Sequence, residues 1–193
     1  RLPFMPLILI AAPATEPVTS SEVKSAARID GSDFDGQITM AIAAFRRKAE
    51  HELGRRLITQ TVELVIDAFP SDSDISLLVP GVQSVVSVKY YDSAGVLQTL
   101  DSAAYSLDAV NTPCWLIAVD SWPETKDVAN AVRVRYIVGY GDAPADVPEG
   151  IRVWIAAHVC QVLDNPSGLD AANVKAMPYL DCLLDAYRSW LVA

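Results

Sequence analysis

Nucleophilic catalysis is the first chemistry to look for, and this chain offers little for it. A Ser–His–Asp or Cys–His arrangement needs a histidine base, and the 193 residues contain only two, His51 and His158. His51 stands among charged residues on the expected polar side of a helix, whereas His158 lies in an apolar helix, where we expect a packed, hydrogen-bonded side chain. The Gly-x-Ser-x-Gly pattern of a nucleophile elbow does not occur. We therefore predict no catalytic residues and no enzyme.

Metal ligation is not indicated either. The three cysteines, Cys114, Cys160 and Cys182, include no Cys-x-x-Cys pair, and a closed zinc site needs four converging ligands. His158 and Cys160 are two positions apart on an expected helix, so they point to different sides. The odd number of cysteines also argues against a disulfide framework and for a reducing compartment. We predict no metal site and no cofactor.

Two glycine-containing segments match ligand-binding loops only in part. Residues 30–36 (DGSDFDG) have the character of a calcium loop, but the alignment puts Ile42 where a bidentate glutamate is needed. Residues 139–141 (GYG) follow an expected strand, yet Pro144 stands where a phosphate-binding loop needs another glycine. We predict turns in both places, with a positive φ allowed in the second.

One basic cluster is present in a chain whose net charge is −9: Arg46, Arg47, Lys48, Arg55 and Arg56. Contact with DNA is one interpretation. The alternatives are that these cations complement the C-terminal end of a helix dipole or pair with acidic neighbours across a subunit contact. The acidic balance repels free nucleic acid but suits a wall past which DNA must slide, and solubility alone is the default explanation.

Apolar and aromatic residues toward the C-terminus are the candidate contacts with other proteins. Buried aromatic side chains dominate both cores and interfaces, and the sequence does not separate the two. The apolar chain end, where Trp190 precedes Leu191 and Val192, favours docking against another surface. The candidate interface anchors are Trp154, Tyr179, Leu183, Tyr187 and Trp190.

The first zone of the chain is expected to be helical. Thr19 with Glu22 has the form of a capping box and predicts a short helix over about residues 20–27. Ser32 with Asp35 predicts a second N-cap. Apolar residues then recur at three- and four-residue steps as far as Gly54, a plausible stop, which predicts an amphipathic helix. These apolar residues are Ile38, Ile42, Phe45, Ala49 and Leu53.

The middle zone, about residues 57–141, alternates apolar and polar residues and is expected to form β-structure. The alternation is clear at residues 62–67, 86–90 and 132–138. Residues 92–95 (DSAG) predict the turn of a hairpin. A period of two places one face of each strand in a core and the other in water.

Helices return in the last zone. Asp146 with Glu149 repeats the capping-box form and predicts a helix over about residues 148–163. This helix is apolar almost all round, which places it centrally in the fold or between subunits. A loop is expected at residues 165–168 (NPSG), and a last helix over about 178–190.

These zones predict an α+β fold, with a helical core from the N- and C-terminal helices and a β-rich antiparallel insertion in the middle. We expect one domain over residues 1–193, helical over 15–56 and 146–192 and β-rich over about 57–141. Hydrophobic residues make up 51% of the chain, which is enough for one good core. The surplus of apolar residues belongs either to a subunit interface or to a generously filled core.

No segment is expected to target or span a membrane. The apolar run Leu7–Ala12 is cut short by Pro13, so it is too short for a signal-peptide core or a bilayer span. Met5 is a candidate natural start. The sequence therefore predicts a soluble protein made in the cytoplasm.

Short segments spread in order over nearly the whole chain form a recognisable series. They are residues 5–7 (MPL), 17–19 (PVT), 22–24 (EVK), 28–30 (RID), 52–61 (ELGRRLITQT), 85–90 (VVSVKY), 132–136 (VRVRY), 139–141 (GYG), 147–148 (VP), 183–184 (LL) and 187–188 (YR). This series resembles the head–tail connector (adaptor) family of tailed phages, whose members are often described only as uncharacterised phage or prophage proteins. The segment after Leu163 departs from the family's pattern.

The resemblance implies a structural subunit of a virion. Such proteins form a heterologous ring of about a dozen copies that docks beneath the portal of a DNA-filled head. The ring extends the DNA channel, through which DNA passes without sequence-specific binding, and presents a platform for tail-completion (stopper) proteins. The implied location is the head–tail junction, after synthesis in the cytoplasm of the bacterial host, and no membrane is involved.

Two other functions remain open at this point. The first is another phage neck or tail-completion protein. The second is a small ligand-binding module that uses the β-rich insertion, with a pocket around His51 or His158.

Overall fold

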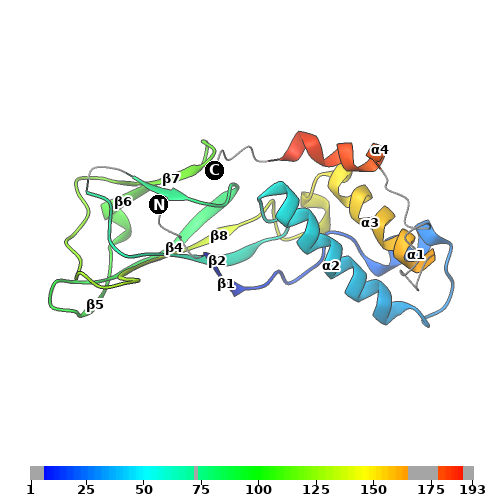
Figure 1. Cartoon of the computed structure of the whole chain (residues 1–193), viewed down its shortest axis with the longest axis horizontal. Coiled ribbons are helices and arrows are strands. Elements are labelled where there is room, and N and C mark those ends of the chain that lie inside the picture. Colours follow the sequence, from blue (N-terminus) through cyan, green and yellow to red (C-terminus); the bar gives the residue numbers. More distant parts are fainter. Residues whose placement is uncertain (1–6, 72–73, 165–177, 189–193) are drawn as a thin grey trace. The chain divides into compact units, whose positions relative to one another are not determined.

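We describe a computed structural model of the chain, which defines residues 7–71, 74–164 and 178–188 (Figure 1). The chain divides into two compact units. The β unit contains the chain up to Pro13 together with Thr59–Gly139, and the helical unit contains Ala14–Ile58 and Tyr140–Trp190. Each unit has a hydrophobic core of its own.

The β unit consists of two antiparallel sheets that share one core. The five-stranded sheet has the order β1-β2-β8-β4-β5, and the three-stranded sheet has the order β3-β7-β6. The strands are β1 (Leu7–Ala11), β2 (Gln60–Ile66), β3 (Ile75–Leu77), β4 (Val82–Tyr91), β5 (Leu97–Thr99), β6 (Tyr105–Asp108), β7 (Cys114–Ala118) and β8 (Val132–Val138).

The alternation in the sequence determines which face of the large sheet is buried. Val62, Leu64 and Val134 are fully buried and face the core, and the small sheet contributes Leu77 and Leu116 to the same core. On β8, Arg133 and Arg135 lie on the opposite face and are exposed and half-buried, so the predicted period of two is confirmed for this strand. On β2 the residues of the opposite face, Glu63 and Val65, are buried as well, so the prediction that this face lies in water was wrong for β2.

A bulge in β4 corrects the prediction for that strand. The alternation in the sequence put Val86 and Val88 on one face. In the structure the pairing shifts between Val85 and Ser87, and Val86 is 52% exposed while Val88 is fully buried. An extra residue in one strand reverses the alternation on one side of the bulge.

The hairpin turn predicted at residues 92–95 is confirmed. The Gly95 N–H donates to the Asp92 carbonyl at 2.7 Å, and Gly95 has a φ of +82°. The turn connects β4 to β5, which pair antiparallel through Lys89 and Thr99.

Strand β1 was not predicted as an element. Its sequence, LILIA, has no polar alternation, yet Leu7 and Leu9 pair with Leu64 and Val62 of β2. The pairing partner lies more than fifty residues away, and strand formation depends mainly on such partners. The β unit is therefore larger than the predicted insertion, because an N-terminal segment joins it.

The helical unit contains α1 (Ser20–Ala27), α2 (Asp35–Leu53), α3 (Glu149–Asp164) and α4 (Pro178–Asp181). The predicted capping box of α1 is confirmed: Thr19 Oγ1 accepts from the Glu22 N–H at 3.2 Å, and Glu22 Oε2 accepts from the Thr19 N–H at 2.7 Å. Gly54 ends α2 with a φ of +63°, the left-handed conformation that a terminal glycine adopts easily.

Apolar stripes on α2 and α3 form the core of the helical unit. The α2 stripe was predicted, and its members other than Phe45 are fully or almost fully buried; Phe45 is half-buried and packs against the same core. The central position predicted for α3 is confirmed, because four of its side chains are fully buried. They are Ile151, Trp154, Ile155 and Val159.

Two predicted caps were wrong. Phe34 is the N-cap of α2, without a side-chain hydrogen bond, and Ser32 contributes only its carbonyl, which accepts from the Asp35 N–H at 3.2 Å. Asp146 belongs to a 3₁₀ turn that precedes α3, and its carboxylate accepts from the Ala143 N–H at 2.9 Å. The carboxylate thus stabilises the turn before the helix.

The last predicted helix is only partly α-helical. After α4 the chain continues as a 3₁₀ helix, η3 (Cys182–Tyr187). The remainder of that prediction, to about residue 190, lies outside the described residues, as do the loop predicted at 165–168 and the candidate start at Met5.

The fold class is α+β, as predicted. In the described part of the chain, the helices are too short or too polar to span a bilayer.

Candidate assembly site

Trp154, the first of the predicted anchors, lies inside the helical unit. Its side chain is fully buried, and its ring packs edge-on against Phe45 with the centroids 6.2 Å apart. Its indole N–H donates to Asp181 Oδ1 at 3.0 Å. A tryptophan whose ring and N–H are both satisfied within its own chain stabilises the fold.

Three of the other predicted anchors lie on α4 and η3. Tyr179 is 72% exposed, whereas Leu183 and Tyr187 are half-buried. Tyr187 packs close to α3, where a Cβ added at Gly150 would be 3.3 Å from its ring. Trp190 lies outside the described residues. Their role as interface anchors stays a prediction.

Leu184 holds η3 against the helical unit. Its side chain is fully buried in the core. A 3₁₀ helix turns once in three residues, so a buried position alternates with positions that face outward. The sequence does not separate Leu184 from its more exposed neighbours.

His158 is packed and hydrogen-bonded, as predicted. Its Nδ1 lies 2.8 Å from the Trp154 carbonyl oxygen, and its ring centroid is 5.3 Å from that of Phe45. Its Nε2 is 3.8 Å from Asp181 Oδ1. His51, in contrast, is exposed on α2, so the two histidines lie in different environments.

The basic cluster pairs largely within the chain. Arg46 Nε donates to Glu16 Oε2 at 2.7 Å, and Lys48 lies 3.7 Å from Glu52. The Arg55 guanidinium stacks over the ring of Tyr140, 4.6 Å from its centroid. Of the predicted roles, pairing with acidic neighbours is therefore observed, but within the helical unit.

Glu50 is the centre of this ionic network. The side chain is 1% exposed, and its Oε2 accepts from Arg46 Nη1 at 3.1 Å and from Arg56 Nη1 at 3.3 Å. Its Oε1 accepts from the backbone N–H of Leu57 at 3.2 Å. The charge of a buried carboxylate must be balanced by ion pairs and hydrogen bonds of this kind. The network therefore stabilises the fold.

Arg152 fastens the segment before α1 to α3. Its Nε donates to the Pro17 carbonyl at 3.0 Å, and its guanidinium pairs with Glu22. The pKa of Glu22 is held below its usual value, first by the Thr19 N–H and hydroxyl and then by Arg152. These contacts position one wall of a surface hollow.

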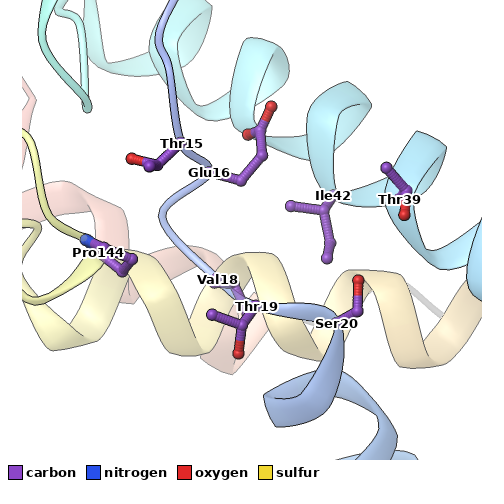
Figure 2. Close-up of a pocket in the computed structure, with 8 residues that line it drawn as sticks. All are labelled: Thr15, Glu16, Val18, Thr19, Ser20, Thr39, Ile42 and Pro144. Atoms are coloured by element: carbon purple, nitrogen blue, oxygen red, sulfur yellow. The ribbon is translucent and has the colours of Figure 1, made fainter.

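That hollow is shown in Figure 2 and has a volume of about 270 Å³. It lies between the segment before α1 and helix α2, with Pro144 at one end. The hollow is smaller than most ligand pockets, which occupy roughly 300–1,000 Å³. Glu16, the charged residue that lines it, is already paired with Arg46. The lining residues are Thr15, Glu16, Val18, Thr19, Ser20, Thr39, Ile42 and Pro144.

The shifted pKa values are explained by local structure. Burial raises the pKa of the Cys160 thiol and of the Tyr140 hydroxyl, although Arg55 opposes the shift at Tyr140. Side-chain hydrogen bonds from Gln98 and Asn111 lower the pKa of Asp92 and Asp108, each within a turn. A thiol with a raised pKa is a poor nucleophile.

Within the described ranges, His, Cys, Asp and Glu nowhere form a group of three that could hold a metal ion.

Comparison with family models and with curated proteins finds no match to this chain. Comparison with solved structures does. A chain from the neck of an empty gene transfer agent particle, computed with C6 symmetry, matches with a TM-score of 0.82 and 18% identity, over 98% of each chain.

Two further solved structures also match this chain over nearly its whole length. A chain from the virion of a native gene transfer agent particle matches with a TM-score of 0.78 and 17% identity, over 97% of each chain. A chain from the neck of the native particle, computed with C12 symmetry, matches with a TM-score of 0.72 and 17% identity, over 96% of this chain and 97% of that one. Over nearly its whole length, this chain therefore has the fold of chains found in gene transfer agent particles.

Proposed function

We propose that this protein is a structural subunit of the neck of a phage-like particle, a head–tail connector. The observation that carries the proposal is the whole-length match to a chain from a gene transfer agent neck, which covers 98% of both chains at a TM-score of 0.82. The ordered series of segments in the sequence points to the same family independently.

The connector acts as a ring of identical copies. The neck structures that resemble this chain were computed with C6 and C12 symmetry, which supports repetition around an axis. The resemblance in sequence implies about a dozen copies. In such a ring each subunit presents two different surfaces to its two neighbours.

The partners we propose are a portal protein on the head side and a tail-completion or stopper protein on the other. Tyr179, Leu183, Tyr187 and Trp190 are the proposed contacts, since aromatic and apolar side chains contribute most to protein interfaces. DNA passes through the ring, and the net charge of −9 suits passage without adhesion. We propose no cofactor and no membrane partner.

We treat the two compact units as one connector domain, helical over residues 15–56 and 146–192 with a β-rich insertion over about 57–141. The whole-length match supports this, because both units are present together in the matched chains. We propose a structural and not an enzymatic role. The buried ionic groups that were described above are engaged in folding contacts.

A gene deletion tests the proposal in the phage or particle that encodes this chain. Without a connector we expect DNA-filled heads and free tails, visible by electron microscopy, and restoration of tailed particles when the gene is supplied from a plasmid. Tailed particles at normal yield in the deletion strain would overturn the proposal.

The second candidate is another neck or tail-completion protein, which a match to a chain from a particle neck supports equally. Cross-linking in assembled particles separates the two. A connector cross-links to portal, whereas a tail-completion protein cross-links to tail-tube subunits.

A further inference from the structure

The two edges of the five-stranded sheet expose apolar side chains and contain no charged residue. Ile8 and Leu9 of β1 are 45% and 50% exposed, and Leu97 of β5 is 49% exposed. Within the described ranges, no strand pairs beyond β1 or beyond β5. Edge strands are usually protected by charged residues or proline, and neither LILIA nor LQT contains one. Such edges are suited to pairing with another strand.

The two edges match in length. The pairing of β1 with β2 is regular over Leu7–Leu9 and then shifts before Ala11, which leaves Ile10 as the extra residue. A bulge ends the straight part of a strand. β5 is also regular over three residues, Leu97–Thr99. Each edge thus offers three residues of regular strand.

Ile8 and Leu97, one exposed apolar side chain from each edge, lie on the same face of the sheet. Ile8 pairs with Glu63 of β2, whose neighbour on β8 is Arg135. Arg133, two positions away on the same face, pairs with Lys89, and Lys89 pairs with Thr99. Side chains alternate along a strand, so Leu97 lies on the face of Thr99 and therefore on that of Ile8.

The edges also run in the same direction. Each neighbouring pair in the order β1-β2-β8-β4-β5 is antiparallel. With five strands, the first and the last therefore point the same way. Two copies related by a rotation can join β5 of one to β1 of the next as a parallel pair.

We propose that β1 of one subunit pairs in parallel with β5 of the next and so continues the five-stranded sheet from copy to copy. The inference deepens the proposed function, on which it rests, by naming the contact between ring neighbours. We choose a second copy as the partner for three reasons. The two edges have the same length of regular strand, their strands run in the same direction, and each edge has an exposed apolar side chain on the same face of the sheet.

A twelvefold ring repeats one junction at every step. One step around a C12 axis rotates a subunit by 30° (360° divided by 12). In such a ring β5 of each copy meets β1 of the next in the same way all around the axis.

The junction buries little surface, and this determines where the ring assembles. A stable interface usually buries roughly 1,200–2,000 Å², more than three residues of strand on each side supply. The paired edges therefore fix the register of neighbours, and assembly is strongest where a portal holds the copies together.

Cysteine cross-linking on the portal tests the junction. In a chain carrying Cys160→Ser and Cys182→Ser, the double variant Ile8→Cys/Leu97→Cys is mixed with the cognate portal and treated with a short bis-maleimide. Ile8 and Leu97 are exposed, and Cys114 is buried and can stay. We expect a ladder of covalent multimers. Mixing the two single variants should give dimers only.

The matched control replaces Leu97→Cys by Val86→Cys, since Val86 is equally exposed but belongs to the interior strand β4. This pair should give no ladder. If portal-bound rings form at the expected mass and Ile8→Cys/Leu97→Cys gives no more ladder than the control pair, the junction is wrong while the connector proposal stands. If no complex with portal forms, the connector proposal fails, and the junction fails with it.

Charges introduced at the two edges provide a second test that does not depend on cross-linker geometry. Ile8→Lys/Leu97→Lys places like charges at the junction, whereas Ile8→Lys/Leu97→Glu places opposite charges there. We expect the first variant to lose ring assembly on portal and the second to retain it, with equal circular dichroism. Equal assembly of the two variants would overturn the proposed pairing.

Discussion

Glu50 is the residue whose surroundings constrain the helical unit most. Its buried carboxylate holds Arg46, Arg56 and the Leu57 N–H together. Removing one partner of a buried ionic network costs about 3–5 kcal/mol, because the remaining charges stay buried without compensation. We therefore expect Glu50→Ala to lower the free energy of unfolding by that amount in urea titrations followed by helical circular dichroism.

Glu52→Ala is the matched control on the same helix. Glu52 is 29% exposed and faces Lys48 at 3.7 Å, and exposed pairs of this kind contribute about 0.3–0.5 kcal/mol. Equal losses for the two variants would show that burial of the Glu50 network adds nothing.

Trp154 and Tyr179 were predicted alike but should respond oppositely to mutation. Trp154 is fully buried and Tyr179 is 72% exposed. Replacing a buried tryptophan by alanine costs about 3–5 kcal/mol, so Trp154→Ala should destabilise the helical unit strongly. Tyr179→Ala should leave thermal stability unchanged and weaken binding to portal, as measured by co-sedimentation. Normal portal binding by Tyr179→Ala would remove this residue from the proposed contacts.

Glu22 makes the stability of the helical unit depend on pH. Its pKa is lowered in the folded protein, chiefly by the Thr19 N–H, from an ordinary value of 4.5. A lowered folded pKa gives stabilisation that is fully present above pH 4.5 and is lost as the pH falls through the folded value. The stability difference between the wild type and Glu22→Gln should therefore be largest near neutral pH and vanish in acid. A difference that stays constant with pH would contradict this assignment.

At the scale of elements, the turn between β8 and α3 depends on a close approach. A Cβ at Gly141 would collide with the Asp146 carboxylate, which itself accepts from the Ala143 N–H. Gly141→Ala should therefore destabilise the protein, and Asp146→Ala should cost less in that background than in the wild type. Thermal unfolding of the two single variants and the double variant measures this coupling. Strict additivity would contradict the collision.

Local signals predicted the elements they belong to. The capping box at Thr19 and Glu22 and the stripe on α2 depend on neighbours within four residues, so the sequence contains them whole. β1 depends on β2 for its pairing, and the exposure of Val86 depends on a bulge against β8. These features arise from long-range register, which no local pattern encodes.

The candidate site was predictable to a smaller extent for the same reason. Apolar character marked Trp154, Leu183 and Tyr187 as candidate interface anchors, and only the folded chain shows that the first is enclosed. The apolar edges at Ile8 and Leu97 become comparable only once both are known to end one sheet.

For the whole molecule, fold and chemistry lead to the same proposal. Ionic groups with the strongest burial are engaged in folding contacts, and apolar side chains remain exposed at strand edges and on α4. Exposed apolar surface without a catalytic constellation is typical of a protein that assembles. The whole-length likeness to chains of gene transfer agent particles supports an assembly of this kind.

The most direct test of the connector proposal is the mass of the complex formed with the cognate portal, measured by light scattering over a wide range of concentrations. We expect the chain to join portal as a ring of about a dozen subunits, with a fixed ratio to portal, even where it remains monomeric alone. A chain that stays monomeric and separate from portal at every concentration would contradict the account.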